Sequence, residues 1–196
     1  MADGVGTGGV APDSDAVDSA DGFDRAANLL GALSLVVADR AADATAAAAG
    51  RSESGAAALS ALLHFLDRPS VDLLGQVLGL TSSGTVRLLD RLAESGYIRR
   101  NPGADGRSTS VTLTDAGKRA AHQVTQARAR VLTAALAALA PDERATFERL
   151  AGKMLAGMRR GPGATRWICR LCDIGVCRGA ESGCPFRAGA RDRDQG

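Results

Sequence analysis

The amino-acid sequence predicts a mainly α-helical fold that carries one small β-hairpin, an α+β arrangement. Apolar residues recur at helical spacings of three, four and seven through most of residues 24–159. One short stretch, 109–113, instead alternates in polarity and is rich in β-branched residues, which is typical of a strand. Aromatic residues make up only 3% of the chain and apolar residues 45%. The core must therefore be built from Leu, Val and Ala, which favours helix packing over a β-sandwich.

The N-terminal end of the chain differs from its middle in composition. Residues 1–22 are rich in Gly, Asp, Ala and Ser without apolar periodicity, which predicts a disordered acidic tail. This tail holds five acids and no base, so the remainder carries a net charge of +7 within a whole-chain charge of +2. The N-terminus lacks the features of a signal peptide, and the longest apolar stretch is too short to span a bilayer. We therefore expect a cytoplasmic protein with no membrane contact.

The first two predicted helices are separated by a glycine-containing break. Helical periodicity begins near residue 24 and continues through an Ala-rich stretch to about residue 49. Residues 50–55 interrupt the pattern. The second helix then presents four leucines on one face between residues 59 and 66.

Two further helices are predicted to follow in close succession. A short helix at 71–78 has Ser70 as its N-cap. Gly79 can adopt the left-handed conformation that ends this helix, and Thr81 can cap the next one. That next helix has its apolar residues at positions i, i+3, i+4 and i+7 and is predicted to stop at Gly96.

The hairpin comes next, followed by two long helices. The turn-rich residues 101–106 join two predicted strands. Thr114 is predicted to cap a helix that runs to about residue 140, and Pro141 starts a final helix. Residues 23–160 thus form one domain, with a winged helix-turn-helix at about 56–113 and long helices at about 24–49 and 114–159.

The helix after Thr81 leaves a polar and basic face outside its apolar stripe. Arginine can pair with guanine edges in a DNA major groove, and serine can reach bases or phosphates. Arg87 is therefore the candidate for base reading and Arg91 the candidate for phosphate contact, while a narrow minor groove would attract Arg107 of the hairpin tip. The predicted DNA-binding residues are Ser82, Ser83, Val86, Arg87, Arg91, Arg99, Arg100, Asp105 and Arg107.

Three short motifs occur in order across this region. They are RLLDRL at 87–92 followed by Gly96, then Asp-Gly-Arg at 105–107, then VTLTDAG at 111–117. With these motifs the stretch 73–119 resembles the MarR family of winged helix-turn-helix regulators. The family usually places the aliphatic residue first where this chain has Thr85-Val86. Either Val86 faces the groove or the helix is slightly rotated.

The resemblance implies a homodimer formed by the first and last helices of the domain. It also implies two recognition helices in successive major grooves of a pseudo-palindromic operator, and a repressor that is released by a small-molecule effector. Redox-dependent release is an alternative that the four cysteines of the chain suggest separately. Independently, one short recognition helix covers few bases, so two half-sites and a two-fold dimer suit double-stranded DNA.

Residues 161–196 form a tail that holds all four cysteines of the chain. Their spacing, C-x2-C-x4-C-x6-C, can supply four thiolates to one tetrahedral zinc ion. The predicted metal ligands are Cys169, Cys172, Cys177 and Cys184. Three alternatives stay open, namely an iron–sulfur cluster, a redox-active thiol pair and unligated cysteines. His64 lies in an apolar helix and is predicted to be an ordinary core or surface residue.

The four cysteines and the absence of known catalytic motifs in the sequence argue against an enzyme. A zinc hydrolase needs an open ligand position, which four cysteines would not leave, and the sequence has no phosphate-loop or Ser-His-Asp signature. Two other functions remain open. One is a dimeric protein-interaction module that does not bind DNA, and the other is a thiol or metal redox protein.

Overall fold

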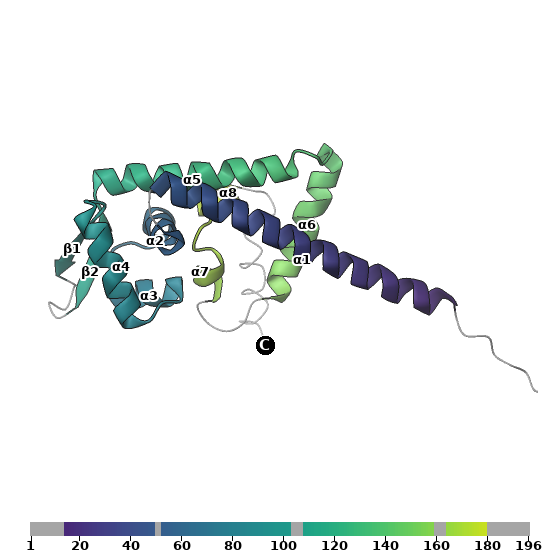
Figure 1. Ribbon diagram of the computed structural model, residues 1–196, viewed down its shortest axis with the longest axis horizontal. Helices are drawn as coiled ribbons and strands as arrows, with labels where there is room; N and C mark the ends of the chain where they lie inside the picture. The colour runs from purple at the N-terminus through teal and green to yellow at the C-terminus, as the bar shows by residue number, and fades with distance from the viewer. Residues whose placement is uncertain (1–13, 50–51, 103–107, 159–163, 180–196) are drawn as a thin grey trace, which may run out of the picture. The chain divides into compact units, whose positions relative to one another are not determined.

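The computed structural model describes residues 14–49, 52–102, 108–158 and 164–179 (Figure 1). The described elements are helices apart from one β-hairpin, so the predicted fold class is confirmed. The elements in chain order are α1 (Ser14–Ala49), α2 (Glu53–His64), α3 (Val71–Leu78), α4 (Ser82–Glu94), β1 (Ile98–Pro102), β2 (Thr109–Leu113), α5 (Asp115–Leu136), α6 (Pro141–Gly157), α7 (Ala164–Ile168) and α8 (Ile174–Gly179). No helix within these described ranges is long and apolar enough to cross a membrane.

Helix α1 begins earlier than the sequence analysis predicted. It starts at Ser14, so residues 14–22 are helical and the predicted disordered tail is corrected there, while residues 1–13 lie outside the described part. Alanine has the highest helix propensity, and acidic residues near a helix N-terminus interact favourably with the helix dipole. The chain divides into two units within this helix, after Ala38.

The larger unit has one hydrophobic core, formed by α2, α3, α4, α5 and the hairpin. Helix α2 packs on α5, and α3 packs on α4. The largest fully buried apolar side chains are Leu59, Leu74, Leu88, Leu89, Val111 and Val124. The core is therefore made of Leu and Val, with the alanines of α2 packed among them, as the composition predicted.

Helix boundaries around α3 and α4 follow from three capping residues. The Ser70 hydroxyl accepts a hydrogen bond from the Leu73 amide at 3.1 Å, and the Thr81 hydroxyl accepts one from the Gly84 amide at 3.2 Å. Gly79 ends α3 with φ of +66°, a conformation that costs glycine little. These three predicted caps are confirmed, and they set the tight turn between the two helices.

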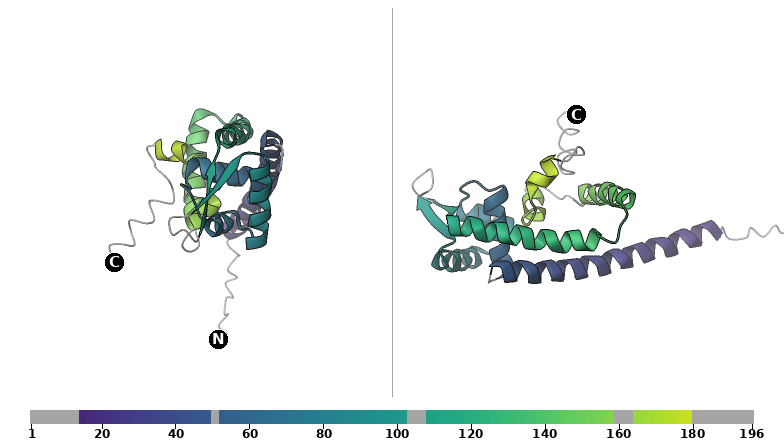
Figure 2. Two further views of the ribbon diagram at one scale, coloured as in Figure 1. Left: turned by 90° about the vertical axis from the view of Figure 1, so that its left-hand side faces the viewer. Right: turned by 90° about the horizontal axis from the view of Figure 1, so that it is seen from above.

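The hairpin is antiparallel (Figure 2), and its second strand also contacts the loop between α2 and α3. Strand β1 pairs with β2 in a register that places Ile98 opposite Leu113. The Val111 amide also donates a hydrogen bond to the Pro69 carbonyl at 3.0 Å, and Ser110 forms a bridge with Ser70. Strand β2 is thus held on both of its edges.

A compact joint connects the hairpin to α5. The Thr114 amide donates to the Tyr97 carbonyl at 3.0 Å, and the Thr114 hydroxyl donates to the Gly96 carbonyl at 2.6 Å. The same hydroxyl accepts a hydrogen bond from the Gly117 amide at 3.0 Å, which caps α5 as predicted. A Cβ atom on Gly117 would overlap the Tyr97 carbonyl oxygen. The motif at 111–117 therefore encodes a close approach of two backbones.

Helix α5 ends at Leu136, before the predicted end near residue 140. The Arg144 side chain donates to the carbonyls of Leu136 and Leu139 at 3.1 and 3.0 Å, which satisfies groups that a longer helix would have paired internally. The Glu143 carboxylate accepts a hydrogen bond from the Ala140 amide at 2.8 Å. The bend between α5 and α6 is thus stabilised by side chains of α6.

Ser60 is the one buried side chain with an unsatisfied polar atom among the described residues. We expect Ser60→Ala to raise the free energy of unfolding by up to about 1 kcal/mol, because it removes a desolvated hydroxyl and introduces a better helix former. Ser95→Ala is the matched control, because the Ser95 hydroxyl donates to the Arg91 carbonyl at 2.8 Å. Removal of this hydroxyl should not raise the free energy of unfolding. Urea denaturation of both variants measures the difference. A Ser60→Ala protein less stable than the unmodified protein would contradict this account.

Candidate nucleic-acid interface

Helix α4 is fixed in rotation by the residues that it buries. Thr85 is 1% exposed, and its hydroxyl donates to the Thr81 carbonyl at 2.9 Å. It packs against Gly75 of α3, where a Cβ atom would lie 2.7 Å from the Thr85 hydroxyl oxygen. Thr85 therefore occupies the inner position, and Val86, which is 45% exposed, faces outward. Of the two alternatives drawn from the Thr85-Val86 order, the structure agrees with the outward valine.

The opposite face of α4 is polar, basic and accessible. The first turn contains no acidic residue, so the positive end of the helix dipole is not neutralised by its own side chains. Every predicted DNA-binding residue within the described ranges is exposed: Ser82, Ser83, Val86, Arg87, Arg91, Arg99 and Arg100. Asp105 and Arg107 lie outside the described residues. The arrangement can present hydroxyl and guanidinium donors to an anionic partner.

Arg100 differs from the other arginines because it contacts α4 directly. Its guanidinium lies 2.7 Å from the Asp90 carboxylate and donates to the Val86 carbonyl at 3.3 Å. Both side chains of the ion pair are partly exposed, so its contribution to stability is at most about 1 kcal/mol. Arg100 therefore holds β1 against the middle of α4, a role that sequence reasoning missed because the two residues are on different elements.

Comparison with known proteins bears on this region. The family model described as the MarR family matches residues 55–108. This stretch, which includes α3, α4 and β1, is therefore similar to the MarR family. No curated protein sequence matches this chain significantly. The match ends before α5.

Solved MarR-family structures share the fold over most of this chain. A MarR family protein from Bacillus stearothermophilus aligns with a TM-score of 0.63 at 22% identity, covering 71% of this chain and 97% of that chain. A MarR family transcriptional regulator from Silicibacter pomeroyi aligns with a TM-score of 0.52 at 28% identity, covering 66% and 90%. A mutant of MepR from S. aureus, bound to an oligodeoxyribonucleotide, aligns with a TM-score of 0.51 at 18% identity, covering 68% and 97%.

Outside the MarR match, residues 164–179 form a cysteine segment that packs on the winged helix. Helix α7 contacts α3 (Figure 1). The Trp167 indole nitrogen lies 3.5 Å from where a Cβ atom of Gly79 would stand, and the Arg170 guanidinium stacks 4.8 Å from the Trp167 ring centroid. Leu171 packs against the hydrophobic core. Sequence reasoning treated this segment as a tail because its few apolar residues alternate with cysteines and charged residues and give no extended periodic signal.

His64, at the end of α2, joins the cysteine segment to α5. Its Nε2 is 2.9 Å from the Thr125 hydroxyl, and its Nδ1 is 3.6 Å from the Asp173 carboxylate. Burial lowers the pKa of His64 more than the nearby Asp173 raises it. The 3.6 Å separation from Asp173 makes a weak ion pair, so burial dominates and the neutral imidazole is favoured. His64 is therefore a bridging residue rather than an ordinary core residue.

Cys169 and Cys172 lie together in one turn of this segment. The Cys172 amide donates to the Cys169 carbonyl at 2.9 Å, and both residues are half-buried thiols. A side-chain hydrogen bond with Cys169 lowers the pKa of the Cys172 thiol to about 6, helped by the positive charges of Arg128 and Arg170 and opposed by burial. The turn thus favours a thiolate at Cys172.

The zinc site stays a prediction. Cys177 lies in α8 and is half-buried, whereas Cys184 lies outside the described residues. Within the part of the chain that the structure describes, no group of three or more His, Cys, Asp or Glu residues could hold a metal ion. Three of the four predicted ligands thus lie within the described residues, and they do not by themselves form a closed tetrahedral site.

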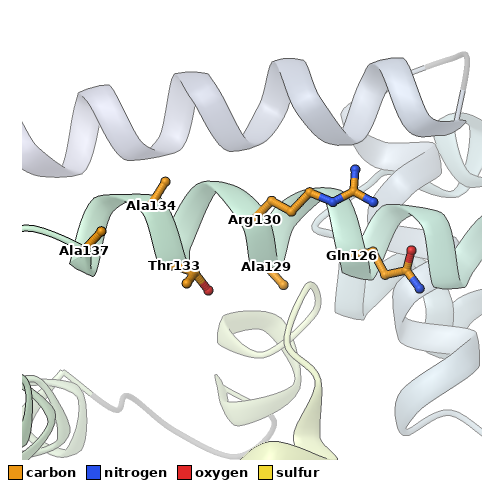
Figure 3. Close-up of a pocket in the computed structure, with 6 residues that line it drawn as sticks. All are labelled: Gln126, Ala129, Arg130, Thr133, Ala134 and Ala137. Carbon is orange, nitrogen blue, oxygen red and sulfur yellow. The ribbon is translucent and has the colours of Figure 1, made fainter.

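One hollow of about 580 Å³ runs along α5. Its lining residues are Gln126, Ala129, Arg130, Thr133, Ala134 and Ala137, which all project from this single helix (Figure 3). A surface formed by one helix, with mostly small side chains, does not enclose a ligand. The small-molecule effector therefore also stays a prediction.

Proposed function

We propose that this protein is a transcription regulator that binds double-stranded DNA as a homodimer and acts as a repressor. The observation that carries the proposal is that α4 has one buried face and one exposed, polar and basic face. Its inner face is locked against α3 through Thr85 and Gly75, and its outer face presents Ser82 and Arg87 without a competing contact from the core. Crystallisation of a MepR mutant with an oligodeoxyribonucleotide supports the same use of the shared fold.

In the proposed complex, the N-terminal part of α4 enters the major groove. Arg87 donates to the edge of a guanine, and Ser82 and Ser83 reach bases or phosphates at the helix N-terminus. Arg91, one turn further along the helix, meets the phosphate backbone. Arg99 and Arg107 of the hairpin add contacts on the flanking groove, where a narrow minor groove attracts arginine.

The proposed homodimer accounts for two exposed apolar surfaces. Leu29, Leu30, Leu33 and Val36 of α1 are each about half exposed. Helix α6 separately exposes Phe147, Leu150, Met154 and Met158. Contiguous apolar side chains of this kind commonly mark an interface between copies of a chain. A two-fold dimer then places two recognition helices roughly 34 Å apart, one turn of B-DNA, which suits a pseudo-palindromic operator.

A salt series of DNA binding tests the proposal. Fluorescence anisotropy with duplexes from the promoter region of the protein's own gene is expected to show affinity that falls steeply with salt. Arg107→Ala is expected to reduce the slope of log K against log salt by about one, since one phosphate or groove contact is lost. A folded dimer that binds no such duplex at low ionic strength would favour the alternative of a protein-interaction module.

A further inference from the structure

We propose that Cys169 and Cys172 form a dithiol site for two-electron oxidants such as hydrogen peroxide, and that closure to a disulfide weakens DNA binding. The DNA-binding part of this inference rests on the proposed function. The site itself rests on the placement of the two thiols in one turn that is packed on the winged helix.

The turn has the geometry that disulfide closure needs. The Cys172 amide and the Cys169 carbonyl are already 2.9 Å apart, so the backbone holds the two residues in a closed turn. The side chains are hydrogen-bonded to each other. A disulfide requires the Cα atoms of its cysteines to be within about 7 Å, a distance that a turn of this kind satisfies. Oxidation therefore starts from two residues that already share a turn and needs only a local movement within that turn.

Closure would act on the residues that attach the segment to the domain. Leu171, which packs against the core, and Arg170, which stacks on Trp167, are the two residues between the cysteines. Both lie inside the ring that a disulfide closes. Bringing the sulfur atoms from hydrogen-bond distance to about 2.05 Å tightens this ring and displaces Leu171 from its position.

The attachment sites of the segment connect it to the recognition helix. Trp167 lies against Gly79, the residue that ends α3 and leads into α4. Asp173 contacts His64 of α2, which in turn contacts Thr125 of α5. The segment thus contacts α2 and α3, which both pack on α4, and it is linked to α5 through His64. A change in its packing has a continuous set of contacts through which to alter the position of α4.

The oxidation is balanced by peroxide as the acceptor of two electrons. The Cys172 sulfur, after losing its proton, attacks one peroxide oxygen and breaks the O–O bond, giving a sulfenic acid and one water once that proton is returned. The Cys169 sulfur then attacks the sulfenic sulfur, the S–S bond forms, and the hydroxyl leaves with the Cys169 proton as a second water. Two thiols are oxidised, and one peroxide is reduced to two waters.

A DNA-independent experiment tests the site. Trp167 is the only tryptophan in the chain, so its fluorescence reports on packing against Gly79. After peroxide treatment of the reduced full-length protein, mass spectrometry is expected to find a Cys169–Cys172 disulfide, and the fluorescence is expected to shift. Cys172→Ser should abolish both changes. Cys177→Ser, the matched control in the same segment, should retain both changes.

The outcomes separate this inference from the proposed function. Oxidation is expected to weaken DNA binding about tenfold in the unmodified protein and in Cys177→Ser, but not in Cys172→Ser, a size typical of coupling between sites. Disulfide formation with unchanged DNA affinity would overturn the coupling. A stoichiometric zinc ion that protects both cysteines from peroxide would overturn the dithiol site. If the reduced protein binds no DNA, the proposed function fails, while mass spectrometry and fluorescence still decide on the site.

Discussion

Gly117→Ala is expected to lower the free energy of unfolding by about 3 kcal/mol. The added Cβ atom would overlap the Tyr97 carbonyl oxygen, which is backbone and cannot rotate away. That carbonyl also accepts the hydrogen bond from the Thr114 amide. Relief of the overlap must therefore separate α5 from the end of β1 and weaken the cap of α5 at the same time. Urea denaturation followed by circular dichroism measures the loss.

Gly157→Ala provides the matched control for helix propensity. Gly157 is also in a helix, but nothing lies within 4 Å of where its Cβ atom would be. Alanine is a better helix former than glycine by up to about 1 kcal/mol, so the free energy of unfolding of this variant should be unchanged or slightly higher. If Gly117→Ala behaves in the same way, the close approach at Tyr97 does not constrain the joint between hairpin and α5.

Arg87→Ala is expected to weaken specific DNA binding by about 1–3 kcal/mol, or roughly 5- to 150-fold, and to relax the preference at one base pair of each half-site. Arg87 is exposed on the outer face of α4, one turn after the N-terminus. Anisotropy titrations with the operator and with single-base variants measure the affinity and the preference. The unfolding free energy should hardly change, because the side chain is on the surface.

Two controls distinguish base reading from general electrostatics. Arg149→Ala removes the same charge from an exposed position of α6 and should leave operator affinity nearly unchanged. Arg91→Ala should weaken binding to all sequences about equally, as a phosphate contact does. Equal loss of affinity for all duplexes in Arg87→Ala would show that this residue does not read a base.

Much of the winged helix could be predicted from sequence because its determinants are local. Ser70, Gly79 and Thr81 act within three residues of their own positions, and caps of this kind have recognisable residue types. The inward position of Thr85 follows from helical periodicity with Leu88 and Leu92. The exposed arginines follow from the same periodicity, since they occupy the positions that the core does not use.

The cysteine segment and the contacts of Arg100 could not be predicted in this way. Leu171 joins the core through partners that are far away along the chain, and the few apolar residues around it do not reveal those partners. His64 meets Asp173 and Thr125 through tertiary packing alone. The early start of α1 was missed for a different reason. Residues 14–22 have few apolar residues and no helical periodicity, which outweighed the helix propensity of their alanines in the prediction.

Attachment of β2 on both edges has a consequence for the way this protein would select its binding sites. Val111 is held by Pro69 and lies in the strand that pairs with β1, so the hairpin is tied to the loop that leads into α3 and its movement relative to α3 is restricted. The distance between α4 and the hairpin, the two elements proposed to contact each half-site, would then vary little. Any adjustment must come from the duplex, so sequences whose bending costs little energy would be favoured even at base pairs that no side chain touches.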